Sequence, residues 1–87
     1  MSLYLDTISK RFIVDEVKRN LSPIQFDIIN TLMSRPEMVF SREQLLGDKN
    51  VTNRAIDVQV CRIKKLMGPY SKWIKVRHGF GYCFEID

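Results

Sequence analysis

Residues 53–67, with the sequence NRAIDVQVCRIKKLM, form the stretch that decides the fold. At about 100° of rotation per residue, one face of the predicted helix is apolar and carries Ile56, Val60, Ile63, Leu66 and Met67. The opposite face carries Arg54, Val58, Cys61, Arg62 and Lys65. Asp57 is the only acid, and we expect it in the first turn, where the helix dipole favours an anion. A basic helix of this size can read DNA, and the rest of the chain would hold it in place.

Charge is distributed unevenly along the chain. The 87 residues are enough for one domain, 1–87, and a hydrophobic fraction of 45% can form its core. The net charge is +4: residues 1–50 carry seven cations and seven acids, whereas residues 51–87 carry seven cations and three acids. One-sided positive charge is typical of a surface that binds a polyanion, although a solvated basic surface has the same composition.

Several functional classes are disfavoured by what the sequence lacks. No run of about 18 apolar residues is present, so no membrane partner is expected, and the polar N-terminus is unlike a signal peptide, which predicts a cytoplasmic protein. Cys61 and Cys83 lack metal-ligand spacing, and His78 is the only histidine, so we expect no metal and no cofactor. No phosphate loop or catalytic set of residues can be assembled, so no catalytic residue is proposed and the protein is predicted not to be an enzyme.

The N-terminal part predicts three strands followed by a helix. The strands are Leu3-Tyr4-Leu5, Phe12-Ile13-Val14 and the segment around Val17, which we interpret as an antiparallel meander. Ser22 and Gln25 then form a capping box at the start of a helix, and Pro36 restricts the residue before it, so this helix ends near Arg35.

The central part predicts a second, short helix before the stretch 53–67. Residues 41–44, SREQ, repeat the capping-box pattern, and Gly47 ends the helix that follows. Thr52 or Asn53 caps the helix over 53–67, and Gly68-Pro69 terminates it.

The C-terminal part predicts a β-hairpin with strands over 73–77 and 82–86 and a turn over 78–81. Trp73, Tyr82 and Phe84 are interpreted as packing on the core rather than as a stacking platform for single strands, while Phe80 at the tip has no assigned role. The fold class is therefore α+β, with a strand meander, three helices and a hairpin.

A helix-turn-helix followed by a hairpin is the winged-helix arrangement, and two regions make the match specific. The first is LSPIQF at 21–26 with VFSREQLL at 39–46. The second is RAIDVQVCRIKKL at 54–66 with IKVRHGFGY at 74–82. In this order and spacing they resemble the C-terminal DNA-binding (effector) domain of OmpR/PhoB-type response regulators, over nearly the whole chain.

The resemblance implies that helix 53–67 lies in the major groove and that hairpin 73–86 is a wing in the adjacent minor groove. It implies that Arg54 grips a phosphate, that Val58 touches base edges, and that Arg62 reaches a base or the backbone. The full set of DNA-binding residues is Arg54, Val58, Gln59, Cys61, Arg62, Lys64, Lys65, Lys75, Arg77 and His78.

Several of these residues have an alternative role. Arg54 can instead pair with Asp57, three residues along the helix. Gln59 lies at the edge of the buried face, where a phosphate contact and a polar contact with the first helix are equally open. Cys61 can be ordinary surface packing, and a phosphate contact of Lys75 is also open.

The sequence departs from the family pattern in two places. Only residues 47–52 separate the second helix from the third, and this short connector puts the usual RNA polymerase contact in doubt. His78 occupies the wing position that is normally arginine, and Arg77 cannot simply replace it because adjacent strand residues point to opposite faces.

The resemblance also implies partners. Family members usually bind direct repeats of double-stranded DNA as two copies and carry an N-terminal receiver domain, which this chain lacks; we expect a homodimer only with that domain or on DNA. Sequence-specific DNA binding for transcription regulation is thus the leading hypothesis. A winged helix used for protein–protein assembly and a non-specific nucleic-acid binder are the alternatives.

Overall fold

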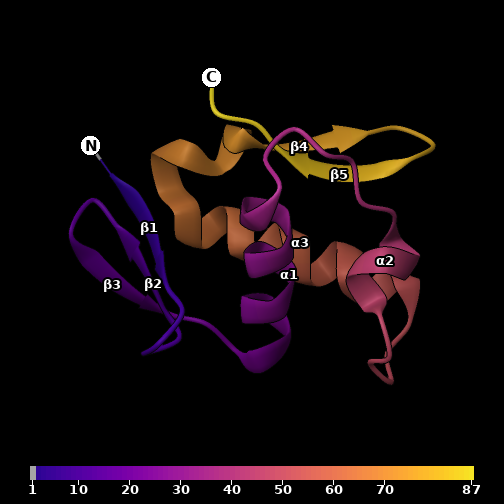
Figure 1. Ribbon diagram of the computed structural model, residues 1–87, viewed down its shortest axis with the longest axis horizontal. Coiled ribbons are helices and arrows are strands. Elements are labelled where there is room, and N and C mark those ends of the chain that lie inside the picture. The colour runs from indigo at the N-terminus through magenta and orange to yellow at the C-terminus, as the bar shows by residue number, and fades with distance from the viewer. Residues whose placement is uncertain (1) are drawn as a thin grey trace.

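The computed structural model describes residues 2–87, and its N-terminal part is the predicted meander. Strands β1 (Leu3–Asp6), β2 (Arg11–Val14) and β3 (Val17–Asn20) form an antiparallel sheet in the order β1-β2-β3. Figure 1 shows this sheet standing to one side of α1. Strand β2 alternates in burial, so its Phe12 and Val14 enter the core, whereas β3 is exposed along its whole length. All three predicted strands are confirmed.

Helix α1 (Pro23–Ser34) begins as the sequence predicts. The Ser22 hydroxyl accepts a hydrogen bond from the Gln25 backbone N–H at 3.3 Å, and the Gln25 side chain accepts one from the Ser22 N–H at 3.0 Å. This capping box satisfies two N–H groups that the first turn leaves free. The helix ends before Arg35, and its buried side chains are Phe26, Ile28, Ile29 and Leu32.

Helix α2 (Arg42–Leu46) has the second predicted capping box, between Ser41 and Gln44, and ends at Gly47. Leu45 is buried, while Leu46 only partly enters the core. Helix α2 packs on α3, so the two form the helix-turn-helix unit.

Helix α3 (Asn53–Met67) has the predicted bounds, with Thr52 rather than Asn53 as its cap. The side chains of Ile56, Val60, Ile63 and Met67 are at most 2% exposed, so the predicted apolar face is the core-facing one, except that Leu66 is only half-buried. The prediction that Asp57 lies in the first turn is wrong, because the helix begins at Asn53 and its first turn has no acid.

A 3₁₀ segment, η1 (Gly68–Trp73), follows α3 and was not predicted. Trp73 therefore belongs to this segment and not to a strand, because the chain needs a turn after α3 before the hairpin can start. The Trp73 ring packs against Tyr70 and Phe84, with ring centroids 4.7 and 6.1 Å apart, which agrees with the predicted core role.

Strands β4 (Ile74–Arg77) and β5 (Gly81–Phe84) form the C-terminal hairpin. The predicted bounds are corrected: β4 begins one residue later, and β5 begins one residue earlier, at Gly81, and ends two residues earlier. Strand β5 has a second neighbour that was not predicted: Phe40 and Tyr82 exchange two backbone hydrogen bonds of 2.8 and 2.9 Å. The hairpin is thereby fixed to the segment between α1 and α2, as Figure 1 shows above α1. No helix within residues 2–87 has the length and apolar character needed to cross a membrane.

Candidate nucleic-acid interface

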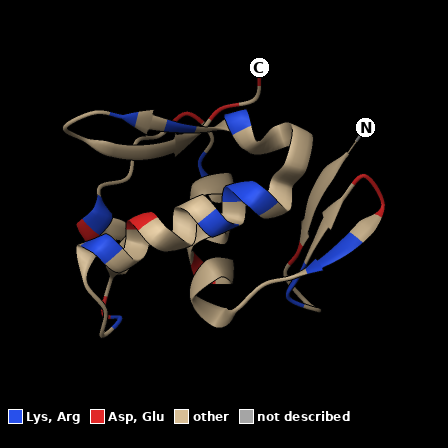
Figure 2. Cartoon of the chain, turned by 180° about the vertical axis from the view of Figure 1, so that it is seen from behind, with Lys and Arg blue, Asp and Glu red and all other residues tan. Residues whose placement is uncertain are grey.

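The outward face of α3 is exposed and basic. Each of Arg54, Val58, Cys61, Arg62 and Lys65 is exposed, and Lys64 is half-buried at the side of the helix. Figure 2 views the molecule from this side, with the cations of α3 in front of the remaining elements. The face is narrow and convex because the opposite face of the helix is buried in the core. Such a helix can enter a groove about 12 Å wide.

The cations of α3 have no acid partner among residues 2–87. The five ion pairs in this part of the chain involve Arg42, Lys49, Lys72, Lys75 and Arg77, but neither Arg54, Arg62, Lys64 nor Lys65. The alternative pairing of Arg54 with Asp57 is not formed. Asp57 is paired instead with Arg42, whose Nε lies 2.9 Å from Asp57 Oδ1. The positive charge of α3 is therefore available to an external anion.

Gln59 makes the polar contact with the first helix that the sequence left open. Gln25 Nε2 donates a hydrogen bond of 3.0 Å to Gln59 Oε1, so α1 and α3 are joined through these amides. The carbonyl oxygen of Gln59 is thus in use, and its amide nitrogen remains a donor.

The cations of the hairpin differ from those of α3 because acids at the C-terminal end hold them. Lys75 Nζ donates to Asp87 Oδ1 at 2.7 Å, and Arg77 Nη2 donates to Glu85 Oε2 at 2.7 Å. The Asp87 carboxyl has a pKa below its usual range, chiefly because of the hydrogen bond from Lys75. Glu85 and Asp87 received no role in the sequence analysis, although a signal was present. Cys83 pairs with Lys75 across the hairpin, and Glu85 and Asp87 follow Cys83 by two and four residues, so an extended chain directs them to the side of Lys75.

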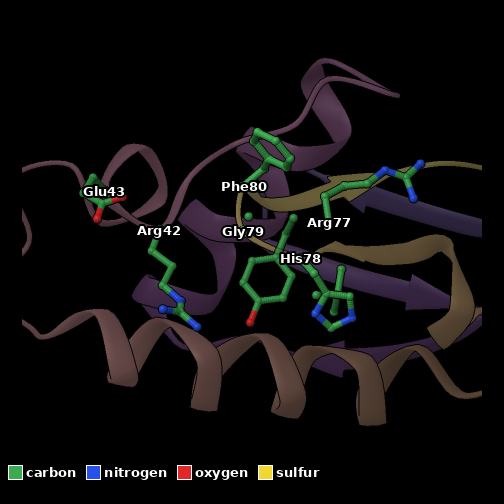
Figure 3. A pocket seen from close by; sticks show the side chains of 9 residues that line it. Arg42, Glu43, Arg77, His78, Gly79 and Phe80 are labelled. Atoms are coloured by element: carbon green, nitrogen blue, oxygen red, sulfur yellow. The ribbon is translucent and has the colours of Figure 1, made fainter.

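The tip of the hairpin is exposed at His78, Gly79 and Phe80. In Figure 3 the His78 ring lies toward α3, whereas the side chains of Arg77 and Phe80 point away from it. The predicted opposition of Arg77 and His78 is therefore observed. A hollow of about 260 Å³ lies between this tip and the start of α2, with Arg42 and His78 among its lining residues.

A groove of about 450 Å³ runs between α3 and the hairpin. Cys61, Lys64 and Lys65 line its α3 side, Val76 lines the β4 side, and Tyr82 also borders it. The groove joins the exposed face of α3 to the hairpin. It brings together predicted residues of α3 only, because the predicted hairpin residues Lys75, Arg77 and His78 do not line it.

Tyr82 and Asp57 make a contact across this groove that the sequence analysis missed. The buried Tyr82 hydroxyl donates to Asp57 Oδ1 at 2.6 Å, the same oxygen that accepts from Arg42. Burial, followed by the hydrogen bond to Asp57, raises the pKa of Tyr82 to about 12, so the hydroxyl keeps its proton at neutral pH. No sequence signal linked residues 42, 57 and 82.

Residues 15–84 match the family described as "Transcriptional regulatory protein, C terminal". The chain is 34% identical over 90 residues to the phosphate regulon transcriptional regulatory protein PhoB of Escherichia coli (strain K12), a match that covers 95% of this chain and 39% of PhoB. The chain thus spans about two fifths of the length of this relative. The matched family is one of transcriptional regulators rather than of enzymes.

Solved structures of DNA-binding domains share the fold. The response regulator AdeR DNA-binding domain, in complex with an intercistronic region, superposes with a TM-score of 0.86 at 20% identity, covering all of this chain and 97% of that one. The Klebsiella pneumoniae RstA DNA-binding domain, in complex with the RstA box, gives a TM-score of 0.84 at 24% identity, covering 98% and 92%. At these identities the likeness confirms the winged-helix fold and its α+β class.

Proposed function

We propose that this chain, which belongs to the family of transcriptional regulatory protein C-terminal domains of the OmpR/PhoB type, binds duplex DNA sequence-specifically to regulate transcription. Helix α3 would lie in the major groove and the hairpin would lie in the adjacent minor groove.

One observation carries the proposal: the outward face of α3 presents cations that have no acid partner within residues 2–87, with Val58 and Cys61 between them. Unpaired cations can replace the counterions of phosphates, which drives binding to any duplex. Small apolar side chains at the centre of the face can meet thymine methyl groups, which distinguishes one sequence from another. The solved complexes of AdeR and RstA support the same use of this fold.

We assign the α3 residues to two tasks. Val58, Cys61 and Arg62 read base edges, because they are exposed at the middle of the helix. Arg54, Lys64 and Lys65 hold the phosphate backbone on either side, since they lie at the ends and flank of that face. Gln59 contributes only its amide N–H groups, because its carbonyl already accepts from Gln25.

The hairpin residues Lys75, Arg77 and His78 contribute less than α3. Lys75 and Arg77 must exchange an acid partner for a phosphate. Exposed ion pairs are worth only about 0–1 kcal/mol, so the exchange is permitted but adds little affinity. The exposed His78 ring points toward α3, so we assign it the role of a hydrogen-bond partner at the edge of the wing.

We further propose that the chain acts as the effector half of a longer cytoplasmic response regulator that binds direct repeats as two copies. Its coverage of 39% of PhoB and the AdeR domain's description as part of a response regulator support this assignment. Contact with RNA polymerase through the connector 47–52 would be weak, because the connector between α2 and α3 is short.

Selection of bound duplexes from a random DNA pool tests the proposal. We expect a motif to be enriched, and the affinity for it to fall steeply with salt, with a slope of roughly −0.9 for each phosphate neutralised. A scrambled duplex and an RNA of the same sequence are the controls. Equal affinity for all three would establish a non-specific binder, and no binding even at low salt would favour a protein–protein module.

A further inference from the structure

Asp57 lies where three elements of the proposed interface meet. Its Oδ1 accepts a hydrogen bond from Arg42 Nε of α2 at 2.9 Å and one from the Tyr82 hydroxyl of β5 at 2.6 Å. Asp57 itself belongs to α3, and its two partners are 15 and 25 residues away along the chain. One carboxylate oxygen therefore links the helix-turn-helix unit to the hairpin.

The Tyr82–Asp57 contact is the one hydrogen bond between the hairpin and α3 in the part of the chain that the structure describes. The backbone groups of the hairpin bond within it, with Glu37 and Phe40, and with Ser71 through Ile74. Glu85, the residue after β5, bonds to Trp73. Its cationic side chains, Lys75 and Arg77, bond to the C-terminal acids. The packing at its base is tight, but the angle that the hairpin makes with α3 has a single polar constraint.

We propose that Asp57 is a positioning residue: by holding the Tyr82 hydroxyl it sets the angle between the wing and α3, so that both elements fit one duplex. This inference rests on the proposed DNA-binding function. A wing held at the correct angle makes its minor-groove contact without a further loss of conformational freedom, whereas a wing that moves must be ordered on binding.

Arg42 completes the arrangement by balancing the charge of Asp57. Asp57 is the only acid on α3, and an unpaired carboxylate near the duplex would repel phosphates. Figure 3 shows the Arg42 guanidinium directed toward α3 from the start of α2. The carboxylate can therefore hold Tyr82 without opposing the basic face of the same helix.

The first test uses Tyr82→Phe, which keeps the ring in its buried site and removes only the hydroxyl. Tyr70→Phe is the matched control, because the hydroxyl of Tyr70, which is also a buried residue, donates to a carboxylate as well, that of Asp15, but joins η1 to the meander. Residual dipolar couplings and amide hydrogen exchange of the free protein report the orientation and the mobility of residues 74–84 relative to α3. We expect both to change in Tyr82→Phe and neither to change in Tyr70→Phe.

The second test uses the duplex recovered by selection and hydroxyl-radical footprinting. We expect Tyr82→Phe to keep the protection at the α3 site, to lose the protection of the flanking minor groove, and to bind roughly tenfold more weakly, because a wing freed from α3 must be ordered on binding. Asp57→Asn, which keeps an acceptor oxygen without the charge, should fall between this variant and the wild type, and Tyr70→Phe should match the wild type.

Unchanged couplings in Tyr82→Phe, or a minor-groove footprint equal to that of the wild type, would overturn the proposal. Failure of the wild type to select any duplex would reject the proposed function instead. In that case the residual dipolar couplings of the free wild type and of free Tyr82→Phe still decide whether the Tyr82–Asp57 contact orients the wing.

Discussion

The cations of α3 and those of the wing are alike in type but differ in their surroundings. Arg54, Arg62 and the two lysines of α3 form no ion pair within residues 2–87, whereas Lys75 and Arg77 are each 2.7 Å from a carboxylate oxygen. An unpaired cation can bind a phosphate at no internal cost, while a paired one must first give up its partner. The difference indicates that binding free energy is concentrated on α3 and that the wing supplies shape and position.

The largest expected effect comes from separating the wing from the body at Gly81. An added Cβ at this residue would lie 2.0 Å from the Phe40 carbonyl oxygen, on a backbone with φ of +143°. We expect Gly81→Ala to lower the free energy of unfolding by about 3 kcal/mol, since backbone must move to relieve the overlap.

Chemical denaturation measures this loss, and Gly79→Ala is the control because its added Cβ would meet nothing within 4 Å. The control should lose only about 1 kcal/mol, from its positive φ. Equal losses in the two variants would show that the Phe40–Tyr82 pairing does not fix the base of the wing.

The next effect is expected from α3 itself. Arg62→Ala should weaken binding of the selected duplex by about 1–3 kcal/mol and relax preference at one position, if the side chain reads a base. Titration against the selected duplex and its single-base variants measures both quantities. Lys18→Ala, an exposed cation of β3, is the matched control and should change neither. A uniform loss over all duplexes would make Arg62 a phosphate contact.

A smaller effect is expected when the wing cations are released. The double variant Glu85→Gln with Asp87→Asn removes the acids that hold Arg77 and Lys75, and it should tighten duplex binding by up to about 1 kcal/mol. The slope of affinity against salt should also become steeper if the released side chains reach phosphates.

Its control must remove negative charge elsewhere, and Glu16→Gln with Asp48→Asn does so at two exposed turn positions. If both double variants tighten binding equally, net charge rather than local release is the cause. The difference in ion pairing between α3 and the wing would then not affect the affinity for DNA.

The smallest effect concerns pH. The pKa of Asp87 is lowered, chiefly by the hydrogen bond from Lys75, so its ion pair adds stability above the ordinary value of 3.8. That contribution is lost as the pH falls through the lowered pKa of the folded state. We therefore expect the free energy of unfolding, measured by denaturation from pH 5 down to pH 2 in roughly one-unit steps, to decrease less steeply with falling pH for Asp87→Asn than for the wild type. Parallel curves would show that the pair does not contribute.

Local chemistry made most of the fold predictable. The capping boxes at Ser22 and Ser41 and the apolar periodicity of 53–67 depend on residues within one or two turns, so the starts of the helices were predicted correctly. The ends of the hairpin were less predictable, because the η1 segment and the pairing of Tyr82 with Phe40 depend on where the chain lies after α3 has packed on the core.

The candidate site was predictable only as a set of exposed residues. Spacing placed Val58, Cys61 and Arg62 on one face of a helix, but it could not tell which cations would find an acid partner. Gln59 meets Gln25 from 34 residues away, and Asp57 meets Arg42 and Tyr82 rather than Arg54. The set of exposed residues therefore follows from helical spacing, whereas the pairing of their charges depends on contacts between distant segments of the chain.

The sequence by itself determined the identity of the elements and the two faces of α3, because helical periodicity, caps and turns act over a few residues. Only the tertiary structure decided that Asp57 joins α2, α3 and the wing, through partners 15 and 25 residues away. Such pairs form between residues far apart in sequence, and their strength depends on distances that are set only when the core closes.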